Sequence, residues 1–117
     1  MFGLQYDNYE VIEYELQTLL SNYFGDRIGS FTISGQRNKP FVALHMEFTV
    51  YNFYNIILNY ERGSFGCAIR GGNNIGIALP NSQKWYEQAD LDVFVKELDK
   101  EIRLRIPDKY LEHYGWL

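Results

Sequence analysis

Cysteine and histidine are scarce in this sequence. It contains one cysteine, Cys67, and two histidines, His45 and His113. A single cysteine excludes an intramolecular disulfide and any zinc site built from several cysteines. Two histidines leave few ligands for other metal sites and few bases for histidine-dependent catalysis. The sequence therefore predicts no metal, no cofactor and no catalytic residue.

Basic residues are too few to outweigh the acidic ones. Lys and Arg number 11 against 15 Asp and Glu, so the formal net charge is −4. Proteins that bind DNA or RNA directly usually present a basic surface, because these partners are polyanions. Anionic membrane surfaces attract basic segments for the same reason. We therefore expect neither direct nucleic-acid binding nor membrane binding.

Long apolar runs are also missing. No stretch of the sequence approaches the ~20 apolar residues that a membrane-spanning helix needs. Residues 1–7 have neither the basic nor the apolar segment of a signal peptide. We expect a cytoplasmic protein, and the unpaired Cys67 fits a reducing compartment.

The sequence does contain enough apolar and aromatic material for one small core. Hydrophobic residues make up 46% and aromatic residues 17% of the 117 positions. Two domains of half this length would each be too small to bury a useful core. The sequence therefore predicts a single domain over residues 1–117.

The spacing of the apolar residues changes twice along the chain. It is helical over residues 8–24 and again over residues 90–102, where Asp90 is placed to cap the helix. Between Asp26 and Pro80 apolar and polar residues alternate instead, as in about five short strands. Turn-length connections allow only antiparallel neighbours. We expect an α+β fold, with an antiparallel meander covered on one face by the N-terminal and C-terminal helices.

The C-terminal part gives three finer expectations. Pro107 suits the start of a short third helix, with Tyr110, Leu111 and Tyr114 facing inward. Asp99 is expected on the solvated side of its helix, in weak pairs with neighbouring basic residues.

The sheet face opposite the helices carries small and polar residues. The small ones on the last two strands are Gly66, Ala68, Gly76 and Ala78. They could admit another chain at close range, or simply face water. His45 and Glu47 share this face as His-x-Glu, but the Pro-Cys-x-x-Cys segment that accompanies this pair in zinc deaminases is absent. We expect His45 to form a surface hydrogen bond.

Two other segments could be mistaken for sites of chemistry. Cys67 alternates with Phe65 and Ile69, which predicts a buried, unreactive thiol. The glycine-rich residues 71–74 join two strands, whereas a phosphate-binding loop joins a strand to a helix. A tight hairpin is the better interpretation.

Acidic residues gather in two segments. One precedes the first basic residue, Arg27, and includes Glu10 and Glu13. The other contains Tyr86, Glu87, Asp90 and Asp92 and follows Trp85. Acids at helix starts are common, because they cap the helix and suit its dipole. The alternative is a contact surface for a basic partner, with Trp85 and Tyr86 as exposed aromatic anchors.

The general layout of the chain resembles bacterial immunity proteins of contact-dependent growth inhibition and related polymorphic toxin systems. The most similar segments are residues 60–77 and residues 104–111. The resemblance implies a non-catalytic protein that neutralises a cognate toxin domain, expected to be a basic nuclease, by occluding its active site. The residues we expect to bind this partner are Glu10, Glu13, Tyr86, Glu87, Asp90 and Asp92. An adaptor or structural interaction protein is the alternative, followed by a small-ligand-binding or enzymatic α+β domain.

Overall fold

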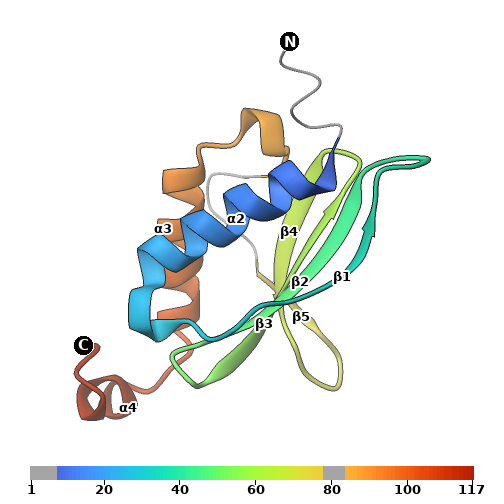
Figure 1. The fold of residues 1–117 in the computed structure, drawn as a ribbon. Coiled ribbons are helices and arrows are strands. Elements are labelled where there is room, and N and C mark those ends of the chain that lie inside the picture. The colour runs from blue at the N-terminus through green and yellow to red at the C-terminus, as the bar shows by residue number, and fades with distance from the viewer. Residues whose placement is uncertain (1–7, 78–83) are drawn as a thin grey trace.

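The computed structural model describes residues 8–77 and 84–117 (Figure 1). A helix opens the described chain, five strands follow, and two further helices close it. The helices are α2 (Tyr9–Phe24), α3 (Leu91–Arg103) and α4 (Asp108–His113), and the short 3₁₀ turns are η1 (Gly25–Arg27) and η2 (Tyr86–Gln88). The strands are β1 (Thr32–Arg37), β2 (Ala43–Val50), β3 (Tyr54–Glu61), β4 (Ser64–Ile69) and β5 (Ile75–Ile77).

The two long helices begin and end at residues suited to those places. The Asn8 side chain accepts a hydrogen bond from the Glu10 amide at the start of α2, and the Asp90 side chain caps α3 in the same manner. Gly25 ends α2 with a φ of +57°, a value that favours glycine. The predicted cap of the second helix is therefore confirmed.

The strands form one antiparallel sheet in the order β1-β2-β3-β4-β5. This confirms the predicted meander. The tightest connection is between β3 and β4, where Arg62 and Gly63 both have positive φ, +53° and +86°. Such a two-residue turn matches the right-handed twist of the strands that it joins.

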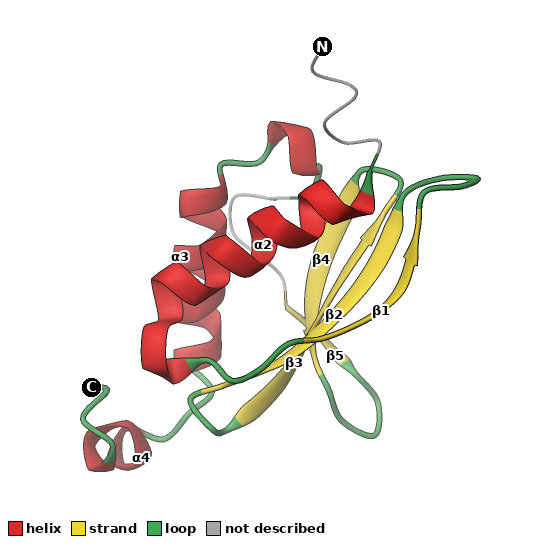
Figure 2. Cartoon of the chain, viewed as in Figure 1, coloured by secondary structure: helices red, strands yellow, loops and turns green. Residues whose placement is uncertain are grey.

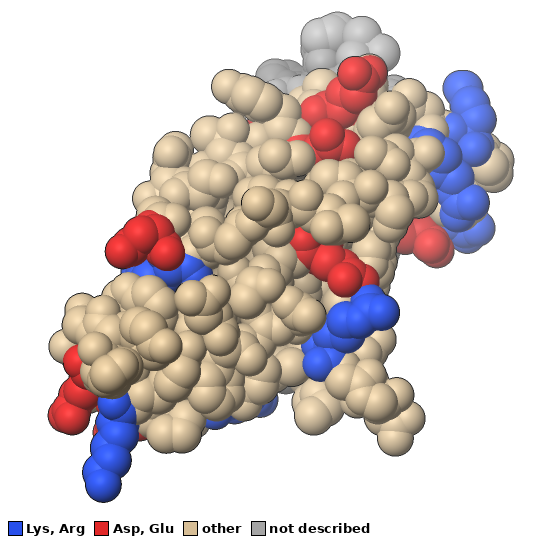
Figure 3. Space-filling model, turned by 60° about the horizontal axis from the view of Figure 1, so that its bottom comes forward, with Lys and Arg blue, Asp and Glu red and all other residues tan. Residues whose placement is uncertain are grey.

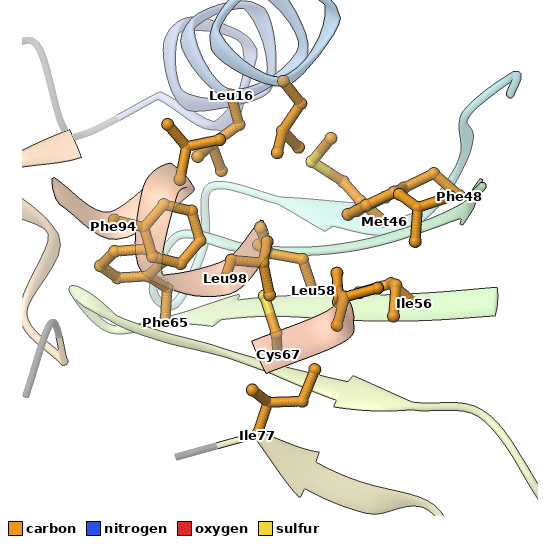
Figure 4. Close-up of a cluster of buried hydrophobic side chains, with 14 of the residues drawn as sticks. Leu16, Met46, Phe48, Ile56, Leu58, Phe65, Cys67, Ile77, Phe94 and Leu98 are labelled. Atoms are coloured by element: carbon orange, nitrogen blue, oxygen red, sulfur yellow. The ribbon is translucent and has the colours of Figure 1, made fainter. Parts of the chain in front are cut away.

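Helices α2 and α3 lie on the same side of the sheet (Figure 2). The core lies between these two layers, and Figure 4 shows Leu16 of α2 and Leu98 of α3 pointing toward Met46 and Leu58 of the sheet. All four side chains are fully buried. The α+β architecture follows from this arrangement, because one apolar sheet face needs a cover.

The structure differs from the sequence expectations at two residues of the C-terminal part. Tyr114 does not face inward but is 48% exposed. Asp99 was expected on the surface but is only 3% exposed, because its side of α3 faces α2 and the Tyr51 turn. Ala78, on the small-residue face, lies outside the described residues.

Candidate functional site

Tyr86 is not the exposed aromatic anchor that we expected. It is 3% exposed, and its ring packs edge-on against Tyr60 and Phe65. The segment pairs with β4 through a bridge between Ser64 and Trp85, and the η2 turn that follows directs Tyr86 into the core. Trp85 is the exposed aromatic residue of this segment, at 49%.

The hydroxyl of Tyr86 links two distant parts of the chain. It donates a hydrogen bond of 2.5 Å to Oε1 of Glu15, 71 positions earlier in the sequence. Through this bond η2 is fastened to the side of α2. Both acidic segments consequently lie where the two long helices begin, in the upper part of Figure 1.

The three acids of the second segment are all exposed, and one of them also caps α3. Oδ1 of Asp90 accepts hydrogen bonds from the amides of Asp92 and Val93, at 3.1 and 3.2 Å. The capping interpretation therefore holds for Asp90. Glu87 and Asp92 are exposed. Asp92 also borders a shallow hollow that reaches Leu19 of α2.

The acids of α2 differ in exposure. Glu10 is exposed in the first turn, whereas Glu13 is half-buried, with Oε1 3.5 Å from Nε2 of Gln36 on β1. We define the acidic helix starts as this group of residues from both segments. They are Glu10, Glu13, Glu15, Glu87, Asp90 and Asp92.

Basic residues adjoin this acidic surface. The guanidinium groups of Arg37 and Arg62 stack on the ring of Phe41, at 4.4 and 4.1 Å from its centroid. Glu87 and Arg62 line the same hollow, together with Lys39. On the face seen in Figure 3, red and blue atoms likewise form small separate groups on a mostly uncharged surface. Acidic and basic side chains therefore alternate over this surface, which is not uniformly negative.

The open sheet face carries a hydrogen-bonded polar cluster. His45 Nε2 lies 3.1 Å from Oε1 of Glu47, and its Nδ1 lies 2.7 Å from Oδ1 of Asn59. Nη1 of Arg70 donates to the same Glu47 oxygen. The hydrogen bond from His45, followed by the charge of Arg70, lowers the pKa of Glu47. His45 thus forms the surface hydrogen bond that we expected.

The same face is hollowed next to this cluster. A depression of about 610 Å³ is lined by Asn59, Gly66, Ala68 and Gly76 among others. A Cβ atom added at Gly66 or Gly76 would meet nothing within 4 Å. The small residues are therefore not required by packing among the described residues.

Cys67 is buried on the helix side of the sheet, as expected. Its side chain points into the core between Leu58 and Ile77 (Figure 4). Burial raises the pKa of the thiol to about 12. The thiol is therefore neutral at physiological pH, and a neutral thiol is a poor nucleophile.

A buried polar cluster, which the sequence analysis missed, surrounds Asp99. Its Oδ1 accepts a hydrogen bond of 2.5 Å from the hydroxyl of Tyr51, and its Oδ2 accepts one of 2.8 Å from Tyr23. Burial and then the bond to Asp99 raise the pKa of both tyrosines, while Arg27 and Arg103 oppose the shift. Asp99 falls on the same helix face as Val95 and Ile102, and this position was the available signal.

Tyr51 occupies an unusual backbone conformation. Its φ is +57°, which is rare for a bulky residue, and Asn52 follows at +50°. Three contacts hold it. The Tyr51 amide donates to Arg27 O (2.7 Å), its carbonyl accepts from the Tyr110 hydroxyl (2.7 Å), and its own hydroxyl donates to Asp99. This turn consequently joins the end of α2, the sheet, α3 and α4.

The described chain has neither a cluster of metal ligands nor a helix suited to a membrane. Within residues 8–77 and 84–117, no three His, Cys, Asp or Glu side chains are grouped to hold a metal ion. No helix in these ranges has the length and apolar character to cross a bilayer.

Comparisons with known proteins add no relative. No protein-family model, no curated protein and no solved structure matches this chain.

Proposed function

We propose that this chain is a non-catalytic binding protein of the immunity type, which neutralises a cognate toxin domain. The observation that supports it is the Tyr86–Glu15 hydrogen bond of 2.5 Å, which fastens the second acidic segment to α2, the helix that carries the first. Grouped exposed acids attract a cationic partner and accelerate its association. A toxin that cleaves nucleic acid would have such a cationic surface, because its substrate is a polyanion.

The mechanism would be occlusion of the toxin's active site. Glu10, Glu87 and Asp92 are exposed on elements that the core already holds in place. A preordered surface loses little conformational entropy on binding. Trp85, half-exposed beside Glu87, supplies an aromatic anchor of the kind that dominates interface energies.

The test is co-expression with the product of the adjacent gene. The double variant Glu87→Lys/Asp92→Lys reverses two exposed charges of the acidic helix starts. It should lose neutralisation and raise the Kd for the toxin domain at least tenfold, because each reversal adds like-charge repulsion to the interface. The association rate of the unaltered protein should also fall as salt rises, since exposed charges are screened beyond ~8 Å at physiological ionic strength.

The matched control is Glu112→Lys, an exposed acid of α4 outside the acidic helix starts. It should neutralise normally, and thermal unfolding should show that all variants are folded. Equal loss in the control would place the contact elsewhere. If the adjacent product is harmless alone, or kills equally with this protein present, the immunity proposal is wrong. The adaptor alternative would then be favoured, with the open sheet face as its first surface to test.

A further inference from the structure

The last turns of α3 line a hollow of about 380 Å³ that is separate from the acidic helix starts. Three basic residues of one α3 face border it, namely Lys96, Lys100 and Arg103. Their spacing of four and three residues places them one above the other on the helix. Within the described residues, none of the three forms an ion pair with an acid.

The acids that border the hollow do not cancel this charge. Asp99 and Asp108 are the acidic side chains of its lining. Both oxygens of Asp99 already accept hydrogen bonds from Tyr51 and Tyr23. The basic side chains of the lining therefore outnumber its acidic ones, which favours an anionic ligand.

Arg103 offers a donor that the protein itself does not use. Its Nε is buried and has no hydrogen-bond partner, the sole such side-chain atom in the described part of the chain. Buried donors are nearly always paired, so an unpaired one calls for a specific explanation. Arg27, by contrast, donates to the carbonyls of Phe24 and Tyr23 at 2.9 and 2.6 Å. Arg103 therefore lines the hollow and also carries a buried donor without a partner.

The remaining wall of the hollow is mainly apolar. It is formed by Leu104, Ile106, Leu111 and Leu117, with Tyr23 of α2 beside them. Leu104 is 70% exposed, although it is a large apolar residue. Small-molecule sites combine such apolar walls with a few convergent polar groups, and their volumes begin at about 300 Å³.

We propose that this hollow binds a small organic anion, with one carboxylate or phosphate group carried on an apolar body. The anionic group would be held by Lys100 and Arg103, and the apolar body would lie against Leu104. The site differs from the proposed toxin contact, because Asp90 and Asp92 lie at the start of α3 and this hollow lies at its end.

The probes are phenyl phosphate and benzoate, titrated into the ¹⁵N-labelled protein and followed by backbone amide shifts. Saturable shifts confined to residues 96–111 are expected for at least one of them, and the tighter probe identifies the anionic group. Inorganic phosphate lacks the apolar body and benzyl alcohol lacks the charge, so each should bind at least tenfold more weakly. If inorganic phosphate binds as tightly as phenyl phosphate, the site holds an adventitious ion only and the proposal fails.

Variants locate the contact. Arg103→Gln and Lys100→Gln should each weaken binding of the tighter probe at least fivefold, and Leu104→Ser should weaken it while leaving the weak binding of inorganic phosphate unchanged. Lys109→Gln is the matched control, because Lys109 is exposed on α4 and does not line the hollow. Lys100 and Leu104 are exposed, so their variants keep the test valid even if Arg103→Gln fails to fold. Unsaturable shifts, or equal affinity in all variants, would overturn the proposal.

Discussion

Asp99 and Glu47 each interact with two other polar side chains, but they lie on opposite sides of the sheet. Asp99 is 3% exposed on the helix side and accepts from two tyrosines. Glu47 lies on the open face, with His45 and Arg70 as partners and its side chain 26% exposed. A carboxylate therefore contributes differently to stability at these two positions. Removal of Asp99 leaves partners buried away from water, whereas water can replace Glu47.

The comparison is tested most strongly by Asp99→Ala. This change leaves the hydroxyls of Tyr23 and Tyr51 without their acceptor and removes the negative charge near Arg27 and Arg103. We expect the free energy of unfolding, measured in urea, to fall by about 3–5 kcal/mol.

Asp99→Asn provides the matched variant for that experiment. It keeps an acceptor oxygen at nearly the same place, so its loss should be smaller than that of Asp99→Ala. Glu47→Ala should lower stability much less than either change. A loss under about 1 kcal/mol for Asp99→Ala, within the range of ordinary surface changes, would show that the buried cluster contributes little.

The buried thiol of Cys67 makes the free energy of unfolding depend on pH, and this dependence tests the helix side of the sheet. Its folded pKa of about 12 lies above the ~8.5 of an exposed thiol, so the unfolded chain loses this proton first as pH rises. Its contribution to stability is complete below about pH 8.5 and is lost above it. The free energy of unfolding should fall by up to about 1.4 kcal/mol per pH unit between about pH 8.5 and 10.

The control is Cys67→Ala, which should have a flatter stability profile over that range whatever its absolute stability. An identical slope in the two proteins would contradict the assignment. A thiol reagent should also label native Cys67 slowly. Rapid labelling would show that the helix side of the sheet opens readily.

Glu47 gives the smallest expected effect, on the open face. Its carboxyl should titrate below the ordinary value of 4.5, and His45→Gln should raise its pKa more than Arg70→Gln, because the hydrogen bond from His45 is the larger cause. A lowered folded pKa means that the stabilising contribution is present above the unfolded pKa and is lost as pH falls through the folded one. Carbon-detected NMR titration measures this directly. An unchanged pKa in His45→Gln would show that the cluster does not form in solution.

The sheet could be predicted because its signals are local. Alternation along each strand and the Arg62–Gly63 turn specify neighbours that are also adjacent in sequence. Asp90 was predictable as a cap for the same reason. Tyr86 and Asp99 were not, since their hydrogen-bond partners Glu15, Tyr23 and Tyr51 are more than 45 positions away. Local patterns carry no information on such partners.

The same distinction between local and distant residues applies to the candidate sites. The acidic residues could be located in the sequence, but the bond that brings them together involves Glu15 and Tyr86, of which we predicted neither as a link. The hollow at the end of α3 was not predicted from the sequence at all. Its lining combines residues of α3 with residues of the chain that follows Leu104. The spacing of the basic residues in α3 does not show where that later chain lies.

The strand order has a consequence for how the protein acquires its structure. Each strand pairs with its sequence neighbour, so the five strands can assemble progressively while the chain is being synthesised. The helical layer cannot, because the Tyr23–Asp99 contact spans 76 positions. Until α3 emerges, only α2 covers the apolar side of the sheet, and the part that α3 will cover stays exposed. This interval is when the nascent chain is most exposed to aggregation and to chaperone binding.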